Sequence, residues 1–167
     1  MSTSIALLRI APLVLSTCVL RFSMDQLLFL WVFLNPSLAK HVNTVLPTYL
    51  DIFMKRKAYV LSAFYPVLIT TGLANRFLAE PGPQAGPAAS WWYDAGTLLA
   101  LLHFAFTARL NRKVDAISAK VKTEARKKKA VEMLGWLHLH AFRSVFVDLP
   151  CMLCFGIAVM SCLVRGD

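Results

Sequence analysis

Four long apolar segments, separated by polar or proline-rich sequence, limit this chain to few kinds of fold. They cover residues 10–34, 58–79, 91–110 and 131–164. Each is long enough to cross a bilayer as an α-helix, which takes ~20 residues. A soluble protein of 167 residues that is 57% hydrophobic cannot bury so much apolar side chain, whereas lipid solvates it. The sequence therefore predicts an all-α integral membrane four-helix bundle, formed as a single domain by residues 1–167.

The ends of these segments follow from local sequence. Asn35-Pro36-Ser37 ends the first segment, because a residue that precedes proline avoids the helical region. Pro66 lies inside the second and should kink it, which membrane helices tolerate. The stretch 80–87 is rich in proline and glycine and is predicted to be a loop. The fourth segment is longer than a bilayer requires, so its first turns should project from the membrane or the helix should tilt.

Basic side chains gather in two of the three connections. The first connection carries Lys40, Lys55, Arg56 and Lys57. The third, residues 111–130, includes the run Lys127-Lys128-Lys129, whereas the second has only Arg76 at its edge. The positive-inside rule then places the first and third connections in the cytoplasm and both termini outside or in a lumen. This predicts a multi-pass protein, of the endoplasmic reticulum or another endomembrane if the source is eukaryotic.

The lysine run has two possible roles. It either sets the topology and contacts membrane lipid, or it binds nucleic acid. No aromatic residues interleave Lys127-Lys128-Lys129, and stacking aromatics are what a single-stranded nucleic acid needs. A basic stretch beside a membrane helix is typical of contact with anionic lipid headgroups. We therefore expect membrane lipid, and no nucleic acid, as the partner of this stretch.

Ionisable residues inside the apolar segments indicate where a functional site lies. Placing such a group in a bilayer costs ~2.5–3.5 kcal/mol on insertion scales, so it tends to face the bundle interior. The chain has several, among them Arg21, Asp25, His103, His138, His140, Arg143 and Asp148. At 1.5 Å per residue, Asp25, Tyr65, His103 and His140 fall at a similar depth in the cytoplasmic half. This convergence predicts a pocket that opens toward the cytoplasmic leaflet.

Helical spacing assigns these residues to faces. Trp136, His140 and Arg143 follow i, i+4, i+7 and share one face of the fourth segment, whereas His138 points to the opposite side. His103 on the third segment should meet that face. Arg21 and Asp25 are four residues apart, so a pair within the first segment is the alternative to a pocket role for Asp25.

Several kinds of function remain open at this point. His103 and His140 on adjacent helices could hold a metal or haem, although the carboxylates are too few for a di-iron centre. Cys151 and Cys154 form a C-x-x-C pair typical of thiol-redox proteins, although cysteines in apolar segments more often serve as small buried hydrophobes. A non-catalytic carrier or assembly protein is a further alternative. The chain lacks the internal repeat that transporters usually show.

Four short motifs give the chain a family resemblance. They are Asn35-Pro36-Ser37-Leu38 at the end of the first segment, Trp91-Trp92 at the start of the third, Leu110-Asn111-Arg112 before the basic connection, and Trp136-x3-His140-x2-Arg143 in the fourth. In these motifs the chain resembles the anthrone oxygenase-like family of small four-span integral membrane proteins. It departs from that family in lacking a proline late in the third segment, near His103.

The resemblance implies a membrane-embedded monooxygenase that oxidises an anthrone-type aromatic polyketide to the quinone. Dioxygen is the co-substrate, and no cofactor or metal is implied. In this hypothesis His140 removes the benzylic proton, Arg143 stabilises the oxyanion and His103 orients the substrate or dioxygen. The substrate-binding residues are then Trp136, Tyr65, Phe104 and Asp25. The implied partners are a small lipophilic aromatic substrate and membrane lipid, and a homo-oligomer is compatible with this arrangement.

Overall fold

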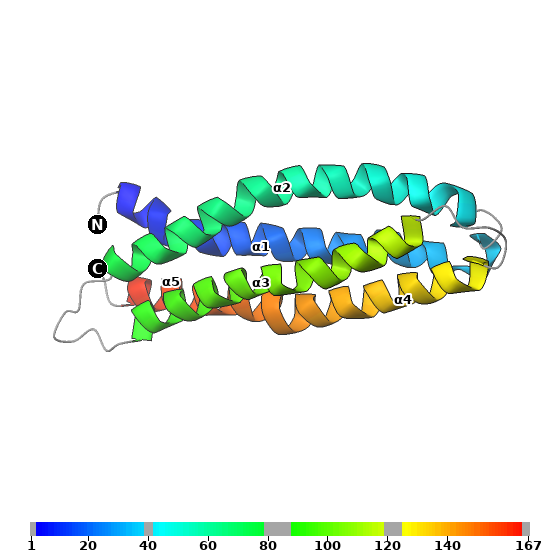
Figure 1. Ribbon diagram of the computed structural model, residues 1–167. Helices are drawn as coiled ribbons and strands as arrows, with labels where there is room; N and C mark the ends of the chain where they lie inside the picture. Colours follow the sequence, from blue (N-terminus) through cyan, green and yellow to red (C-terminus); the bar gives the residue numbers. More distant parts are fainter. Residues whose placement is uncertain (1–2, 39–41, 79–87, 119–124, 165–167) are drawn as a thin grey trace.

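The computed structural model describes residues 3–38, 42–78, 88–118 and 125–164, which are almost entirely helical and include no β-strand. Helix α1 (Thr3–Trp31) is followed by two short 3-10 turns, Val32–Leu34 and Pro36–Leu38. Helices α2 (Val42–Leu78) and α3 (Ala88–Ser118) come next. Helix α4 (Ala125–Arg143) runs through a π-helical segment, Ser144–Asp148, into α5 (Leu149–Val164). These last three elements form one continuous rod (Figure 1).

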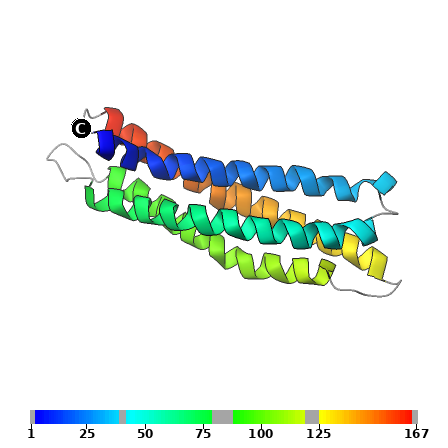
Figure 2. The ribbon, with the colours of Figure 1, turned by 90° about the horizontal axis from the view of Figure 1, so that it is seen from above.

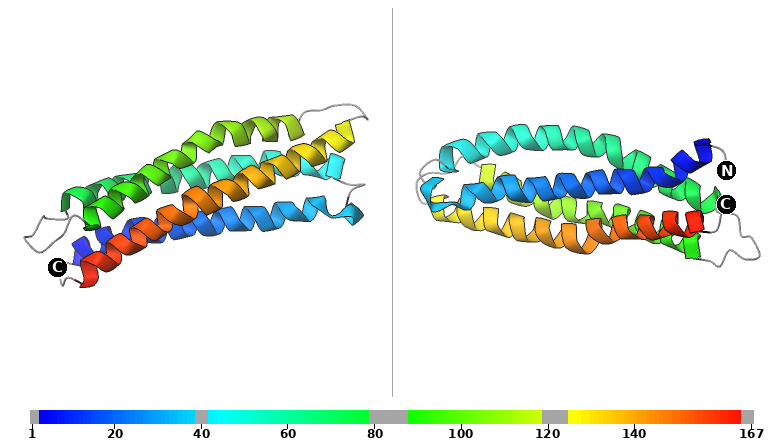
Figure 3. Two further views of the ribbon diagram at one scale, coloured as in Figure 1. Left: turned by 90° about the horizontal axis from the view of Figure 1, so that it is seen from below. Right: turned by 180° about the vertical axis from the view of Figure 1, so that it is seen from behind.

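The four rods lie side by side and alternate in direction. Helix α1 packs against α2 and α5, and α3 packs against α2 on one side and the α4–α5 rod on the other. The start of α1, the end of α2, the start of α3 and the end of α5 all lie at one end of the bundle (Figure 1). Views from above, below and behind show the same ring of rods (Figures 2 and 3). This agrees with the all-α four-helix bundle expected from the sequence.

Three stretches are long and apolar enough to cross a membrane: Thr3–Leu34, Thr44–Phe77 and Val131–Leu163. Large apolar side chains such as Leu28, Phe29 and Leu98 are exposed on the outside of the bundle, where lipid would solvate them. Helix α3 is not among the three. Polar side chains that it turns inward, Thr97 and His103 among them, lower its mean hydropathy. The chain is thus an integral membrane four-helix bundle in which the crossing of α3 stays a prediction.

Each of the four rods extends beyond the limits of its predicted segment. Helix α2 begins at Val42 rather than near residue 58, so the basic stretch around Lys57 is helical and not a loop. It passes through Pro47 and Pro66 without a break and bows along its length (Figure 1). Helix α3 continues to Ser118 and α4 starts at Ala125, so both extend into the basic third connection. The predicted loop 80–87 lies wholly outside the described residues.

Two apolar clusters fill the bundle. One, near the chain ends, includes Tyr65, Tyr93 and Phe155. The other, toward the opposite end, includes Leu30, Leu50, Leu110 and Trp136. Small residues allow the helices around the first cluster to approach closely, as in many membrane bundles. A Cβ atom added at Gly96 of α3 would lie 2.8 Å from the Phe155 ring of α5.

Candidate active site

A layer of buried polar side chains lies between the two apolar clusters. All four rods contribute to it, and no member has more than 7% of its surface exposed. The members are Ser23 and Gln26 from α1, Lys57 from α2, His103 from α3, and His140, Arg143, Ser144 and Asp148 from the fourth rod. Water is excluded at this depth of a bilayer, so these groups must satisfy one another or a ligand.

Asp148 is the centre of this layer. Its Oδ1 accepts a hydrogen bond from His103 Nδ1 at 2.8 Å. Its Oδ2 accepts from Ser23 Oγ at 3.1 Å and from Arg143 Nε at 3.3 Å. Arg143 Nη2 also donates to Ser23 Oγ, at 3.1 Å. A side chain that accepts three hydrogen bonds and sits beside a guanidinium is a carboxylate, and the Arg143–Asp148 pair then carries no net charge.

This network assigns the tautomer of His103. Because Nδ1 donates to Asp148, the proton lies on Nδ1 and Nε2 carries a lone pair. Nε2 is buried and has no hydrogen-bond partner among the described residues. The Tyr65 hydroxyl lies 2.5 Å from Nδ1, and the two rings pack with centroids 4.5 Å apart. His103 is thus an imidazole oriented by a carboxylate, with its basic nitrogen left free.

His140 has the opposite tautomer. Its Nε2 donates to the main-chain oxygen of Ser23 at 3.1 Å, which leaves the lone pair on Nδ1. That nitrogen and Trp136 Nε1 are also buried without a partner in the described part of the chain. The His140 imidazole stacks on the Trp136 indole, with centroids 4.6 Å apart and planes 13° apart. These two side chains fix one face of α4 against α1.

The π-helical segment brings Arg143 and Asp148 together. Leu149 N–H bonds to Ser144 O, five residues back, instead of four. In a regular α-helix, side chains five residues apart point roughly 140° away from each other. Pro150 explains the wider turn, because proline has no N–H and its ring would clash with the carbonyl four residues earlier. Without this segment the guanidinium and the carboxylate would not meet.

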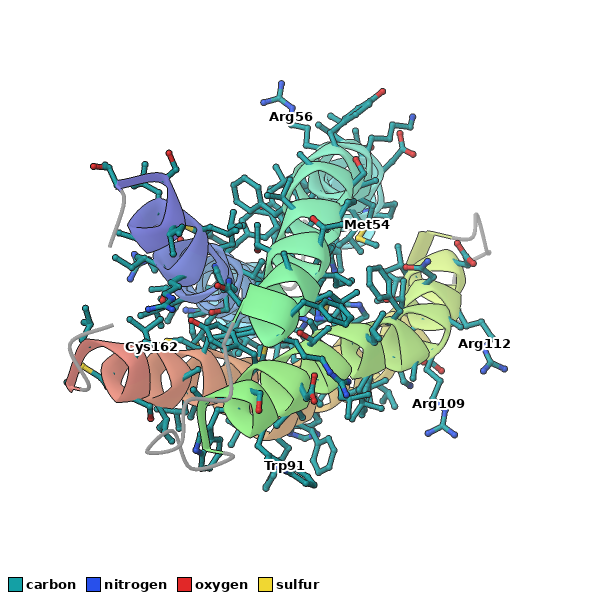
Figure 4. The ribbon with its side chains drawn as sticks, turned by 90° about the vertical axis from the view of Figure 1, so that its left-hand side faces the viewer. Met54, Arg56, Trp91, Arg109, Arg112 and Cys162 are labelled. Carbon is teal, nitrogen blue, oxygen red and sulfur yellow. The ribbon has the colours of Figure 1, made fainter. Side chains whose placement is uncertain are left out.

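A cavity of about 460 Å³ between α2 and α3 reaches this network. His103, Arg143 and Lys57 line its buried inner part, and exposed Asp51, Lys55, Asn111 and Asp115 line its mouth. The remaining walls are Met54, Ala58, Leu61, Thr107, Leu110 and Val114. Seen along the bundle, Met54 lies on the side of α2 turned toward α3, whereas Arg56, Arg109 and Arg112 point outward (Figure 4). The mouth lies toward the basic end, which is the predicted cytoplasmic side.

Lys57 is the least expected member of this cavity. It is 7% exposed, and its Nζ lies 5.7 Å from the centroid of the Trp136 ring. None of the ion pairs in the described residues involves it. Sequence reasoning treated it as part of a basic connection, because the second span was predicted to begin one residue later.

The structure brings together five of the seven predicted site residues: Tyr65, His103, Trp136, His140 and Arg143. His138 is exposed on the opposite side of α4, as its spacing predicts. Phe104 lies at the rim, half exposed, with its ring edge against Tyr65 at 5.0 Å. Sequence reasoning missed the roles of Ser23, Lys57 and Asp148.

Asp25 does not join this group. It pairs with Arg21 Nη2 at 3.0 Å, and the side chains are 32% and 75% exposed. The reason is the orientation of α1, which turns Ser23 and Gln26 inward and Asp25 toward the outside. The pair within the helix, weighed as the alternative, is therefore what the structure shows.

The structure also bears on the metal-binding and thiol-redox functions that the sequence left open. Among the described ranges 3–38, 42–78, 88–118 and 125–164, no three His, Cys, Asp or Glu side chains come together in a way that could hold a metal ion. Cys151 and Cys154 are buried free thiols, and Cys151 Sγ donates to Gly96 O at 3.2 Å. That thiol therefore contributes to the contact between α3 and α5.

Comparison with known proteins identifies relatives along nearly the whole chain. The probable epoxidase scpX of Mollisia scopiformis is 32% identical over 163 residues, which cover 98% of this chain and 100% of the relative. The chain belongs to the family of this epoxidase. Other members of the epoxidase family are pydX of an Acremonium species, 30% identical over 94% of each chain, and gkaX of Penicillium citrinum, 28% identical over 98% of this chain and 99% of the relative.

No family model and no solved structure matches the chain. Membership in the epoxidase family nevertheless indicates an oxygenase-type function in fungal secondary metabolism, the same kind of chemistry as that of the anthrone oxygenase-like proteins. It favours the enzymatic interpretation of the sequence over a carrier or an assembly protein.

Proposed function

We propose that this protein is a membrane-embedded oxygenase that uses dioxygen to epoxidise a carbon–carbon double bond of a lipophilic secondary metabolite. The epoxidase names of its relatives support the reaction class. The single structural observation that carries the proposal is the buried, unpartnered Nε2 of His103, a residue that lines the cavity together with Arg143. A free base next to a fixed cation suits the formation of a substrate anion.

The first step is proton removal. His103 Nε2 takes a proton from an acidic C–H of the substrate, and Asp148 stabilises the imidazolium that forms. Arg143 stabilises the negative charge that develops on the substrate oxygen. His103 takes the role of base that the sequence suggested for His140, because His103 lines the cavity and His140 does not. His140 positions α1 through the main chain of Ser23.

The second step needs no added reductant, because the substrate anion supplies the electrons. It passes one electron to dioxygen, and the resulting radical pair combines to form a C–O bond. The peroxide then takes back the proton from His103 to give a hydroperoxide. Transfer of the distal oxygen to a neighbouring double bond gives an epoxide and leaves an alcohol. Both oxygen atoms end in the product, so the atoms and electrons balance without a cofactor.

Anthrone oxidation is the second candidate, supported by the Trp136-x3-His140-x2-Arg143 resemblance. The same deprotonation and reaction with dioxygen give a hydroperoxide at the benzylic carbon. Loss of water from it gives the quinone carbonyl, so one oxygen atom stays in the product. Tyr65 and Phe104, packed edge to face beside His103, offer apolar aromatic surface for a flat substrate.

We also propose that the reaction takes place within an endomembrane. The substrate dissolves in lipid, and the protein crosses an endomembrane such as the endoplasmic reticulum four times, with α3 as one of the crossings. Two of the polar side chains of α3, Thr97 and His103, are buried against the other helices, which supports this placement.

Isotope labelling tests the reaction. Membranes that contain the protein are incubated under isotope-labelled dioxygen with a lipid extract as the source of substrate. The extract comes from a strain of the source organism in which the gene has been deleted. Epoxidation should add two labelled atoms to one metabolite, and anthrone oxidation should leave one labelled atom in the product and one in water. Incorporation of a single labelled atom that depends on an added reductant would overturn the cofactor-free mechanism.

The variants His103→Gln and His138→Gln make a matched pair in the same assay. The His103 change should lower the rate ~10²-fold or more, the usual worth of a positioned base, whereas the change at exposed His138 should leave it intact. Full activity of His103→Gln would exclude His103 as the base.

A further inference from the structure

Among the described residues, the ion pairs in and beside the cavity leave one buried basic side chain, Lys57, without a partner. Arg143 is neutralised by Asp148, and Lys55 at the mouth pairs with Asp51 at 2.8 Å. Lys57 lines the same cavity and has neither an ion pair nor a hydrogen bond among the described residues. Its one recorded polar contact is with the face of the Trp136 ring. The buried inner part of the cavity therefore contains one basic group that no acidic side chain of the described residues neutralises.

A buried lysine without a partner is unfavourable, and most chains place the ammonium group in water instead. The position of Lys57 prevents this, because its side chain is buried and lines the cavity, whereas the neighbouring Lys55 and Arg56 are exposed. The ring of Trp136 attracts the cation without neutralising it. A group that binds in the cavity can supply the missing charge.

We propose that Lys57 binds an anionic oxygen of the substrate, so the substrate class is a lipophilic molecule with an acidic group such as a carboxylic acid, an enol or a phenol. This rests on the proposed function, since it takes the cavity as the substrate site. The acidic group pairs with the Lys57 ammonium, and the apolar remainder packs against Met54, Leu61 and Leu110. The reacting carbon then lies toward His103 on the same cavity wall. Lys57 is a substrate-binding residue that determines specificity.

Binding of a matched pair of probes tests this without any turnover. The probes are 2-naphthoate and its uncharged methyl ester, which have no acidic C–H and no isolated double bond. Affinities are measured at neutral pH in a non-ionic detergent, from the quenching of tryptophan fluorescence. For each protein, the affinity for the acid is divided by the affinity for the ester. This ratio should be at least ~tenfold higher in the wild type than in Lys57→Met. Comparing the two ratios cancels the different partition of the probes into micelles.

Two further variants complete the experiment. Lys57→Arg keeps the charge and should keep the preference for the acid. Arg56→Met removes the neighbouring outward-facing charge and should also keep it (Figure 4). Equal ratios in the wild type and Lys57→Met would overturn the proposal. So would a preference that survives in Lys57→Met, because the anion would then bind elsewhere, for instance at Arg143.

Folding of the variants is monitored by thermal unfolding in the same detergent. Lys57→Met should be at least as stable as the wild type, because an unpaired charge is replaced by an apolar side chain of similar length. A large loss of stability in both Lys57→Met and Lys57→Arg would assign the lysine a structural role and overturn the proposal. The oxygenase function would stand in that case, because it is tested separately by labelled dioxygen.

Discussion

Asp148 accepts hydrogen bonds from α1, from α3 and from its own rod. Its carboxylate therefore contributes to folding as well as to the proposed catalysis. In Asp148→Asn, the amide nitrogen replaces one acceptor with a donor that would face His103, Ser23 or Arg143. Arg143 would also remain buried without a counter-charge. We expect a loss of about 3–5 kcal/mol in the free energy of unfolding, measured by thermal or denaturant unfolding in detergent.

Asp25→Asn is the control for this prediction. Asp25 pairs with Arg21 on the outside of α1, so the same chemical change should cost no more than about 1 kcal/mol and should leave activity unaffected. Equal losses of stability in the two variants would contradict the assignment of Asp148 as the centre of the polar layer.

The sequence allowed the face of α4 to be predicted but not the position of Asp148. Trp136, His140 and Arg143 follow the regular helical period, so their common face can be read directly. The π-helical segment then adds one residue to the turn, and the same period carried on to Asp148 points it away from Arg143. Pro150 was the available signal, since proline within a membrane helix marks a place where the period changes.

At the scale of helices, Gly96 marks a close approach of α3 and α5. A methyl group there would lie 2.8 Å from the Phe155 ring, which is fully buried between α3 and α5. Gly96→Ala should therefore lower the free energy of unfolding by about 1–3 kcal/mol. The double change Gly96→Ala with Phe155→Leu should recover part of this loss, because the smaller side chain removes the clash.

Gly156→Ala provides the matched control. The added methyl group would lie 3.8 Å from Leu13, an ordinary contact distance. Its unfolding temperature should stay near that of the wild type. A loss as large as that of Gly96→Ala would show that helix flexibility, and not close packing, sets the requirement for glycine.

Pro150→Ala tests the π-helical segment. Alanine restores an N–H group and removes the ring, so a regular α-helix becomes possible through this region. Arg143 and Asp148 would then separate, and His103 would lose its orienting partner. We expect the rate to fall ~10²-fold, as for other small misplacements of catalytic groups, and the unfolding temperature to fall as well, because two buried charges lose their partners. Wild-type activity in this variant would mean that the segment does not depend on Pro150.

The rotation of α1 shows why part of the site lay beyond sequence analysis. This helix has no distinct polar face, so its sequence does not reveal which of Ser23, Asp25 and Gln26 points inward. Charge favoured Asp25, but packing against α2 and α5 selects the two uncharged side chains. Four helices and their antiparallel order followed from segment length and loop composition, whereas rotation of an apolar helix depends on its neighbours.

For the whole molecule, the basic end should face the cytoplasm. Single cysteines at Thr3 and Arg112, introduced into a variant lacking the four native cysteines, lie at opposite ends of the bundle. In sealed vesicles with the cytoplasmic side outward, an impermeant maleimide should label residue 112 and not residue 3. Labelling of residue 3 alone would invert the topology, and labelling of both would mean that the rods do not span the membrane.

The cavity between α2 and α3 has apolar walls, Met54, Leu61 and Leu110 among them. A lipophilic substrate for it dissolves in the surrounding bilayer, so we expect it to arrive by diffusion in two dimensions, and we expect its mole fraction in the bilayer, and not its molarity in the buffer, to set the rate. Addition of inert phospholipid at a fixed amount of substrate should slow the reaction in proportion to the added lipid. An organelle could regulate such an enzyme simply by expanding the membrane around it.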